Sequence, residues 1–288
     1  MTNIYFDFED GNGPVPAHQH PNGGGWVADT AKVDATARVG PDAQVYGNAK
    51  VYGDAWVSSN ARVYGNAEVF GKARVYGTVE VYGNATVSGN ARVYDDAWVS
   101  SNAWVSDDAR VSDDARVYGN AIVYDDAWVG GNAWVGGNAW VGGNAWVYGD
   151  AEVSGNVWVY GDAWVYNNAK VYGNAEVFGK ARVYGNATVP GTAWVFGNAE
   201  VFGNARVYGY AEVFGKARVY GNATVSGTAW VYGNTEVSGT AWVYGYARVY
   251  GNEVVNGDET EKELIGIDVK DRIFINGKWY VEEVEDDE

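Results

Sequence analysis

Valine recurs at every sixth position of this chain. The series runs unbroken from Val27 to Val255 and contains 39 six-residue units. From Ala31 to Ala247, alanine stands two residues before each of these valines, with Val79, Val157 and Thr235 as the exceptions. After each valine the chain usually reads Tyr, Phe, Ser or Gly, then Gly, then Asn or Asp. A helix repeats near 3.6 residues and a strand near 2, so a period of six predicts a short strand followed by a corner.

The side chains of such a unit divide into inward and outward positions. Successive side chains of a strand point to opposite faces, so if valine points inward its two neighbours point outward. Alanine is small enough for the next inward position, where the chain bends. The Gly-Asn pair suits the corner, because Gly and Asn adopt the left-handed backbone conformation at low cost. Strands this short cannot form a flat sheet, and the pattern predicts a coil in which each turn buries its valines against its neighbours.

The repeat resembles a known family. The run YGNAKVYGDAWV, residues 46–57, is similar to the hexapeptide pattern of the left-handed parallel β-helix superfamily. The resemblance implies an all-β fold: a single-stranded left-handed parallel β-helix, a triangular solenoid of about 13 rungs with three hexads in each rung. More narrowly, HPNGGGWVADTAKV (residues 20–33) and the VYGNA units resemble uncharacterised bacterial and phage proteins, some of them labelled acyltransferase-like.

Three segments follow from where the repeat begins and ends. Residues 1–24 lack the hexad and are predicted to cap the first turn, with a strand in NIYFDF. Residues 25–257 form the solenoid. Residues 258–288 are an acidic cap, predicted as a β-hairpin around Asn276-Gly277, because Asn-Gly between two alternating apolar runs is a strong hairpin signal. Caps of this kind oppose end-to-end polymerisation.

Composition narrows the classes of function. Asp and Glu number 37 against 20 Lys and Arg, a net charge of -17, which argues against direct nucleic-acid binding through phosphates. With no cysteine, neither disulfides nor thiolate chemistry is available. The N-terminus has no long apolar run, so we expect no signal peptide and no membrane association. The expected location is the cytoplasm, or a virion if the chain is phage-encoded.

The resemblance also sets requirements for catalysis. Acyltransferases of the superfamily use a histidine base and a loop that protrudes from the coil, and its carbonic anhydrases hold zinc with three histidines. This chain has two histidines, His18 and His20, both before the first coil, and its hexads contain no insertion. Outward serines such as Ser58, Ser100 and Ser106 have no histidine to activate them. We therefore expect no enzyme activity and no cofactor other than a possible calcium ion.

The calcium hypothesis rests on paired aspartates. Asp-Asp replaces Gly-Asn at four corners: Asp95 and Asp96, Asp107 and Asp108, Asp113 and Asp114, Asp125 and Asp126. A turn of three hexads places the first pair beside the third and the second beside the fourth. Four carboxylates so close would suit Ca²⁺, but aspartate is also simply a good turn residue.

The same spacing stacks aromatic residues on the outer faces. The predicted columns are Trp128, Trp146 and Trp164; Trp104, Ile122, Trp140 and Trp158; and Tyr148, Tyr166 and Tyr184. Arg74, Arg92 and Arg110 stack in the same way. Such ladders stabilise a sheet, and their exposed parts can form an interface. Relatives of this fold commonly trimerise side by side, which favours a homo-oligomer, whereas sugar rings also stack on aromatic ladders.

Three functions remain open from the sequence. The leading interpretation is a non-catalytic scaffold, related to phages or mobile elements, whose ladders serve self-association or bind a protein or glycan. An acyltransferase-like enzyme is the alternative. An acidic mimic of nucleic acid is a further alternative, although residues 258–288 alone hold 12 acidic and 4 basic residues and the coil is only mildly acidic.

Overall fold

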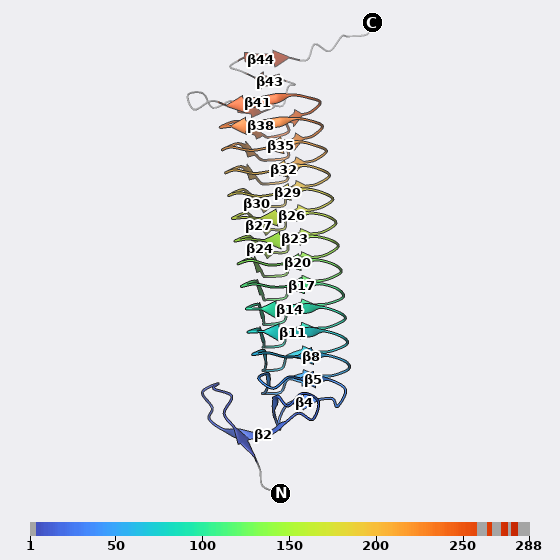
Figure 1. Cartoon of the computed structure of the whole chain (residues 1–288). Helices are drawn as coiled ribbons and strands as arrows, with labels where there is room; N and C mark the ends of the chain where they lie inside the picture. The colour runs from blue at the N-terminus through green and yellow to red at the C-terminus, as the bar shows by residue number, and fades with distance from the viewer. Residues whose placement is uncertain (1–3, 258–263, 267–271, 276–277, 282–288) are drawn as a thin grey trace. The chain divides into compact units, whose positions relative to one another are not determined.

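The computed structural model describes residues 4–257, 264–266, 272–275 and 278–281. All its regular elements are β-strands, and no described residue is helical. The chain divides into two compact units, Met1–Asp150 and Ala151–Glu288. Within each unit, three strands make one turn of a coil, and strands of successive turns stack in parallel (Figure 1). Paired residues lie 18 apart, and the two units together contain about 13 turns, as the repeat predicts.

The first unit contains three sheets, A1, B1 and C1. Sheet A1 consists of β3 (Trp26–Ala28), β6 (Gln44–Val45), β9 (Arg62–Val63), β12 (Glu80–Val81), β15 (Trp98–Val99), β18 (Arg116–Val117) and β21 (Trp134–Val135). Sheet B1 consists of β4 (Lys32–Val33), β7 (Lys50–Val51), β10 (Glu68–Val69), β13 (Thr86–Val87), β16 (Trp104–Val105), β19 (Ile122–Val123) and β22 (Trp140–Val141). Sheet C1 consists of β5 (Arg38–Val39), β8 (Trp56–Val57), β11 (Arg74–Gly77), β14 (Arg92–Asp95), β17 (Arg110–Val111), β20 (Trp128–Val129) and β23 (Trp146–Tyr148).

The second unit contains the sheets A2, B2 and C2. Sheet A2 consists of β24 (Glu152–Gly155), β27 (Lys170–Gly173), β30 (Thr188–Gly191), β33 (Arg206–Val207), β36 (Thr224–Val225), β39 (Trp242–Tyr244) and β42 (Leu264–Gly266). Sheet B2 consists of β25 (Trp158–Val159), β28 (Glu176–Val177), β31 (Trp194–Val195), β34 (Glu212–Val213), β37 (Trp230–Val231) and β40 (Arg248–Val249). Sheet C2 consists of β26 (Trp164–Tyr166), β29 (Arg182–Val183), β32 (Glu200–Val201), β35 (Arg218–Val219), β38 (Glu236–Gly239) and β41 (Val254–Gly257).

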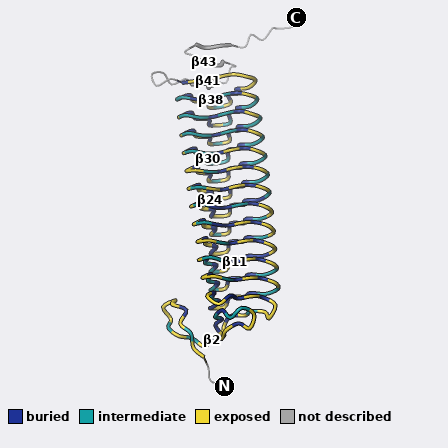
Figure 2. The backbone as a smooth tube through the Cα atoms, in the orientation of Figure 1, coloured by how far each residue is buried: buried dark blue, intermediate teal, exposed yellow. Residues whose placement is uncertain are grey.

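The inward positions carry the core that the repeat predicts. Every valine of the series is buried except Val33, which is partly exposed. The alanines two residues earlier are buried as well, and so are the larger Val79 and Val157 that replace two of them. Thr235, the polar exception, is fully buried and donates its hydroxyl to the Tyr232 carbonyl oxygen at 2.6 Å. Buried and exposed residues therefore alternate along each turn (Figure 2).

The corners explain the Gly-Asn signature. Gly65 has a φ of 71°, and a Cβ on it would lie 3.0 Å from the backbone nitrogen of Gly83 in the next turn. Left-handed geometry and close approach thus both favour glycine here. The next residue, Asn66, donates its backbone N–H to the Gly83 carbonyl at 2.7 Å. Corners are therefore hydrogen-bonded from turn to turn, like the strands between them.

Asparagine side chains add a second ladder along one edge of the first unit. Each amide nitrogen donates to the amide oxygen one turn later, at 2.8–3.3 Å, through Asn48, Asn66, Asn84, Asn102, Asn120 and Asn138. Each interior member both donates and accepts, which neither Asp nor Ser at this position could do in the same way.

We predict that Asn102→Ala lowers the melting temperature more than Asn60→Ala. The two asparagines occupy identical VSSNA segments of the first unit, but Asn102 makes two ladder bonds and Asn60 makes no side-chain hydrogen bond among the described residues. A hydrogen bond contributes roughly 0.5–1.5 kcal/mol, and exposure favours the low end, so the difference should be about 1 kcal/mol. Thermal denaturation of both variants tests this, and equal losses would contradict it.

The N-terminal segment covers the first turn by antiparallel pairing. β1 (Tyr5–Phe6) pairs with β2 (Val15–Gln19), and β2 pairs with β3 at the end of sheet A1. Phe8 is buried against Tyr46, with ring centroids 4.8 Å apart, so a residue outside the coil begins one of its aromatic stacks. The Val39 N–H donates to the Asn22 carbonyl at 3.0 Å, which satisfies the edge of sheet C1. The hexad could not predict this second strand, because it arises outside the repeat.

The described residues of the C-terminal tail form three further strands. β42 extends sheet A2 by pairing in parallel with β39. β43 (Arg272–Ile275) and β44 (Lys278–Val281) pair antiparallel, with Ile275 opposite Lys278. The turn predicted at Asn276-Gly277 lies outside the described residues.

Candidate functional site

The outward positions of each strand form columns with one residue per turn. A ring at the position after valine lies over the ring of the previous turn, at a centroid distance close to the strand spacing. The longest stack is on sheet B2: Tyr160, Phe178, Phe196, Phe214, Tyr232 and Tyr250, at 4.8–5.4 Å. Offset stacks of this kind contribute about 0.5–1.5 kcal/mol per pair beyond area burial. The columns therefore first of all stabilise the coil.

The predicted Trp128 column is present in the first unit. Trp128 and Trp146 pair on β20 and β23, with ring centroids 4.9 Å apart and planes at 61°. The Trp128 indole N–H donates to the Ser112 hydroxyl at 2.9 Å, and Tyr148 meets the Trp128 ring edge-on at 6.3 Å. Trp164, in the second unit, meets Tyr166 edge-on.

The second predicted column lies on sheet B1. Trp104, Ile122 and Trp140 are successive partners on β16, β19 and β22. The Trp104 indole N–H donates to the Ser88 hydroxyl at 3.1 Å. The residue nevertheless remains 47% exposed to solvent. Trp158, in the second unit, is 46% exposed and meets Tyr160 edge-on.

The third predicted column is a stack on sheet C2. Tyr166 and Tyr184 lie 4.9 Å apart, and Phe202 and Tyr220 continue the series. Three predicted neighbour relations join residues of different units and stay predictions of the repeat: Trp146 with Trp164, Trp140 with Trp158, and Tyr148 with Tyr166.

Arginines lie between tryptophans in a way that the sequence analysis missed. On sheet A1 the Arg116 guanidinium lies 4.9 Å from the Trp98 ring centroid and 5.1 Å from that of Trp134. On sheet C1, Arg38 and Arg74 flank Trp56 at 5.0 and 5.9 Å. Cation–π contacts contribute roughly 0.5–1 kcal/mol at exposed sites. The spacing of Arg and Trp by one turn in the sequence was the signal that could have revealed them.

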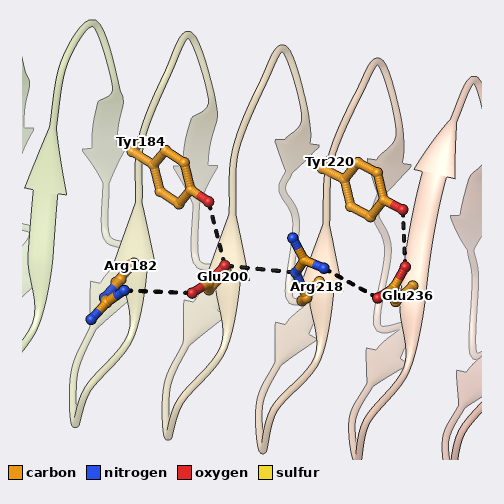
Figure 3. Close-up of polar contacts among 6 residues, drawn as sticks. All are labelled: Arg182, Tyr184, Glu200, Arg218, Tyr220 and Glu236. Atoms are coloured by element: carbon orange, nitrogen blue, oxygen red, sulfur yellow. Dashed lines mark hydrogen bonds and ion pairs between the residues drawn. The ribbon is translucent and has the colours of Figure 1, made fainter.

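Sheet C2 carries an alternating ion-pair column (Figure 3). Glu200 lies 3.7 Å from Arg182 and 3.7 Å from Arg218, and Arg218 lies 3.2 Å from Glu236. The Tyr184 hydroxyl donates to Glu200 at 3.3 Å, in the aromatic column beside it. Every charge of this column thus has an opposite charge one turn away.

This environment changes the ionisation of Tyr184. Burial, followed by the Glu200 carboxylate, raises the pKa of Tyr184 from the ordinary 10 to about 12. An unfolded tyrosine therefore loses its proton first as the pH rises, and stability is lost between pH 10 and about 12.

We predict that Glu200→Gln moves the Tyr184 pKa back toward 10, because it removes the nearby negative charge. Tyrosinate absorbance of the folded protein, with Tyr184→Phe subtracted, measures the shift. Tyr184→Phe itself should lose less stability above pH 10 than the wild type in denaturant titrations. A Tyr184 titration that is unchanged by Glu200→Gln contradicts the assignment.

The paired aspartates lie side by side as predicted. Asp96 donates its backbone N–H to the Asp113 carbonyl, and Asp108 to the Asp125 carbonyl. The first residue of each pair has a φ of 56–60°, the conformation that glycine has at other corners. The Asp113 and Asp125 carboxylates accept backbone N–H groups of glycines one turn later, at 2.8 and 3.1 Å. Among the described residues no group of three or more His, Cys, Asp or Glu side chains could hold a metal ion.

Turn geometry thus gives these aspartates a role without an ion, and calcium binding stays a hypothesis. It predicts a higher melting temperature with calcium than with a chelator, because an ion that binds only the folded state stabilises it. Equal temperatures would contradict it.

The two histidines have separate environments. His18 Nδ1 lies 2.9 Å from an Asp29 carboxylate oxygen at the surface. His20 is buried, and its Nδ1 accepts the Asn22 backbone N–H at 3.3 Å. Both lie in the N-terminal segment rather than on a strand of the coil.

A family model of repeat proteins agrees with this architecture. Five segments match the family model described as YdcK Beta solenoid repeat: residues 43–59, 87–101, 115–131, 181–197 and 217–233. The chain is a β-solenoid repeat protein. Solved structures similar to this solenoid include an Arabidopsis UDP-N-acetylglucosamine acyltransferase, at 15% identity and a TM-score of 0.36, with 72% of this chain and 71% of that chain covered. No curated protein matches the solenoid. Its described residues include no helix long and apolar enough to cross a membrane.

Proposed function

We propose that the solenoid is a non-catalytic interaction scaffold whose aromatic faces associate with further copies of the chain. The observation that carries the proposal is an uncharged face on sheet B1, formed by Thr86, Ser88, Trp104, Ser106, Ile122, Tyr124 and Trp140. Trp104 and Trp140 are 47% and 40% exposed on it. Exposed apolar patches on otherwise charged proteins commonly mark interfaces.

The shape of this face supports self-association. Its four strands, β13, β16, β19 and β22, pair in parallel without a bulge, so the outward side chains form a regular surface. Charged residues near it, such as Asp107 and Asp125, lie at the corners. An apolar centre with a polar rim is typical of interfaces. The family resemblance favours a trimer, and an association with phages or mobile elements is part of the same proposal.

The absence of catalysis is also part of the proposal. Acyl transfer of the kind found in the superfamily needs a histidine base on the coil. Here His18 pairs with Asp29, and the His20 ring is buried. Two serines of the outer faces, Ser88 and Ser112, accept indole N–H groups.

We predict a trimer in solution, measured by light scattering coupled to size-exclusion chromatography. Ile122→Lys should shift it to monomer, because it places a charge at the centre of the uncharged face. Asn60→Lys, which adds the same charge at an exposed corner between β8 and β9, away from sheet B1, is the matched control and should leave the mass unchanged. Unchanged circular dichroism of both variants confirms that the fold is retained.

A wild-type monomer at every concentration contradicts self-association. A trimer that survives Ile122→Lys assigns the interface to another face.

A further inference from the structure

A column of unneutralised arginines lies on sheet C1 of the first unit. Arg74 pairs with Arg92, and Arg92 with Arg110, on the adjacent strands β11, β14 and β17. All three side chains are exposed. Neighbouring strands lie about 4.8 Å apart, and like charges directly opposite each other destabilise a sheet. None of the three arginines forms an ion pair within the described part of the chain.

The equivalent column of the second unit shows the alternative. There Arg182, Glu200, Arg218 and Glu236 alternate in sign, and each contacts its neighbour (Figure 3). The repeat thus can place a glutamate between two arginines at this position. In the first unit an arginine, Arg92, occupies that position between Arg74 and Arg110, although the protein has a net charge of -17.

No carboxylate among the described residues forms an ion pair with the arginine column, although Asp95 lies on β14 itself. Asp107 and Asp113 lie at the corners on either side of β17, but both carboxylates accept serine hydroxyls, from Ser106 and Ser112. Asp113 also accepts the Gly131 backbone N–H. Neither carboxylate lies within ion-pair distance of an arginine of the column.

Aromatic rings and hydroxyls adjoin the charges. Trp56 lies one strand before Arg74 and is 38% exposed, with the Arg38 guanidinium over its ring. Tyr76 and Tyr94 stack at 5.3 Å in the neighbouring column. A surface hollow of about 230 Å³ is lined by Trp56, Ser58, Ser59, Arg74, Tyr76 and Arg92. The hollow therefore combines guanidinium forks, hydroxyls and an aromatic platform.

We infer that this arginine column binds an acidic oligosaccharide built of uronic acids. Guanidinium groups bind carboxylates with paired, charge-assisted hydrogen bonds. Sugar rings stack on aromatic side chains. Tyr76 lines the hollow beside the column, whereas the Trp56 ring is already flanked by Arg38 and Arg74. A linear uronic acid polymer carries one carboxylate per ring, so its charges recur along the chain as the arginines recur from strand to strand.

Charge density favours this ligand over duplex DNA. Duplex DNA carries one charge per about 1.7 Å, so the acidic chain would repel it more strongly than a polymer with one charge per sugar. The inference goes beyond the proposed scaffold role and does not need the uncharged face, which lies on sheet B1.

The test measures binding of oligogalacturonate to the full chain by calorimetry at physiological salt, with a neutral cello-oligosaccharide for comparison. We expect binding of the acidic sugar only. Arg92→Gln should weaken it at least about tenfold, the loss of one or more charge-assisted hydrogen bonds. Arg182→Gln makes the same charge change in the second unit and should leave the affinity unchanged.

A second variant separates binding from folding. Arg92→Glu recreates the alternating pattern of the second unit, so it should abolish binding while the melting temperature stays equal or rises. The inference is overturned if the wild-type chain does not bind oligogalacturonate. It is also overturned if the Arg92→Glu variant still binds it. Binding of single-stranded DNA or polyphosphate in place of the sugar assigns the column to a phosphate ligand and also overturns it.

Discussion

Everything in this protein depends on the constant hydrogen-bonded register between successive turns. The strand residues pair with their counterparts one turn away, and the corner amides donate to the corner carbonyls of the next turn. Valine is buried at one inward position and alanine at the next in nearly every hexad, so each turn has the same interior. No insertion interrupts the series between Val27 and Val255.

A constant register makes every outward residue the neighbour of its own counterpart. Where a column holds phenylalanine and tyrosine, the rings stack; where it holds asparagine, the amides form a chain of hydrogen bonds. Where it holds alternating charge, ion pairs form, and where it holds one sign, the charges face each other. The interior is thus common to all turns, and the individual properties of the protein lie in the order of residues along its columns.

Much of this could be read from the sequence, because it depends only on period. The buried valines, the three sheets, the pairing of each strand with its counterpart one turn later and the adjacency of Asp96 with Asp113 all follow from spacing. The orientation of the tryptophan side chains does not follow from spacing. Trp104 and Trp128 reach sideways to Ser88 and Ser112, in the other outward column of the preceding turn, and side-chain torsions decide this contact. The packing of Phe8 on Tyr46 could not be predicted from the repeat either, because Phe8 lies outside it.

The uninterrupted hexads also determine how such a chain can change in length. Loss of residues 80–97, one complete turn of the first unit, would join Val79 to Trp98 and keep every remaining residue on its own sheet. Loss of residues 80–85 alone would keep the valine series but move Thr86 from sheet B1 to the position of β12 on sheet A1, and every later column of the unit would change face. Gain or loss of a whole turn therefore keeps each surface column on its own sheet. Gain or loss of a single hexad moves every later column to a different sheet but leaves the buried core intact.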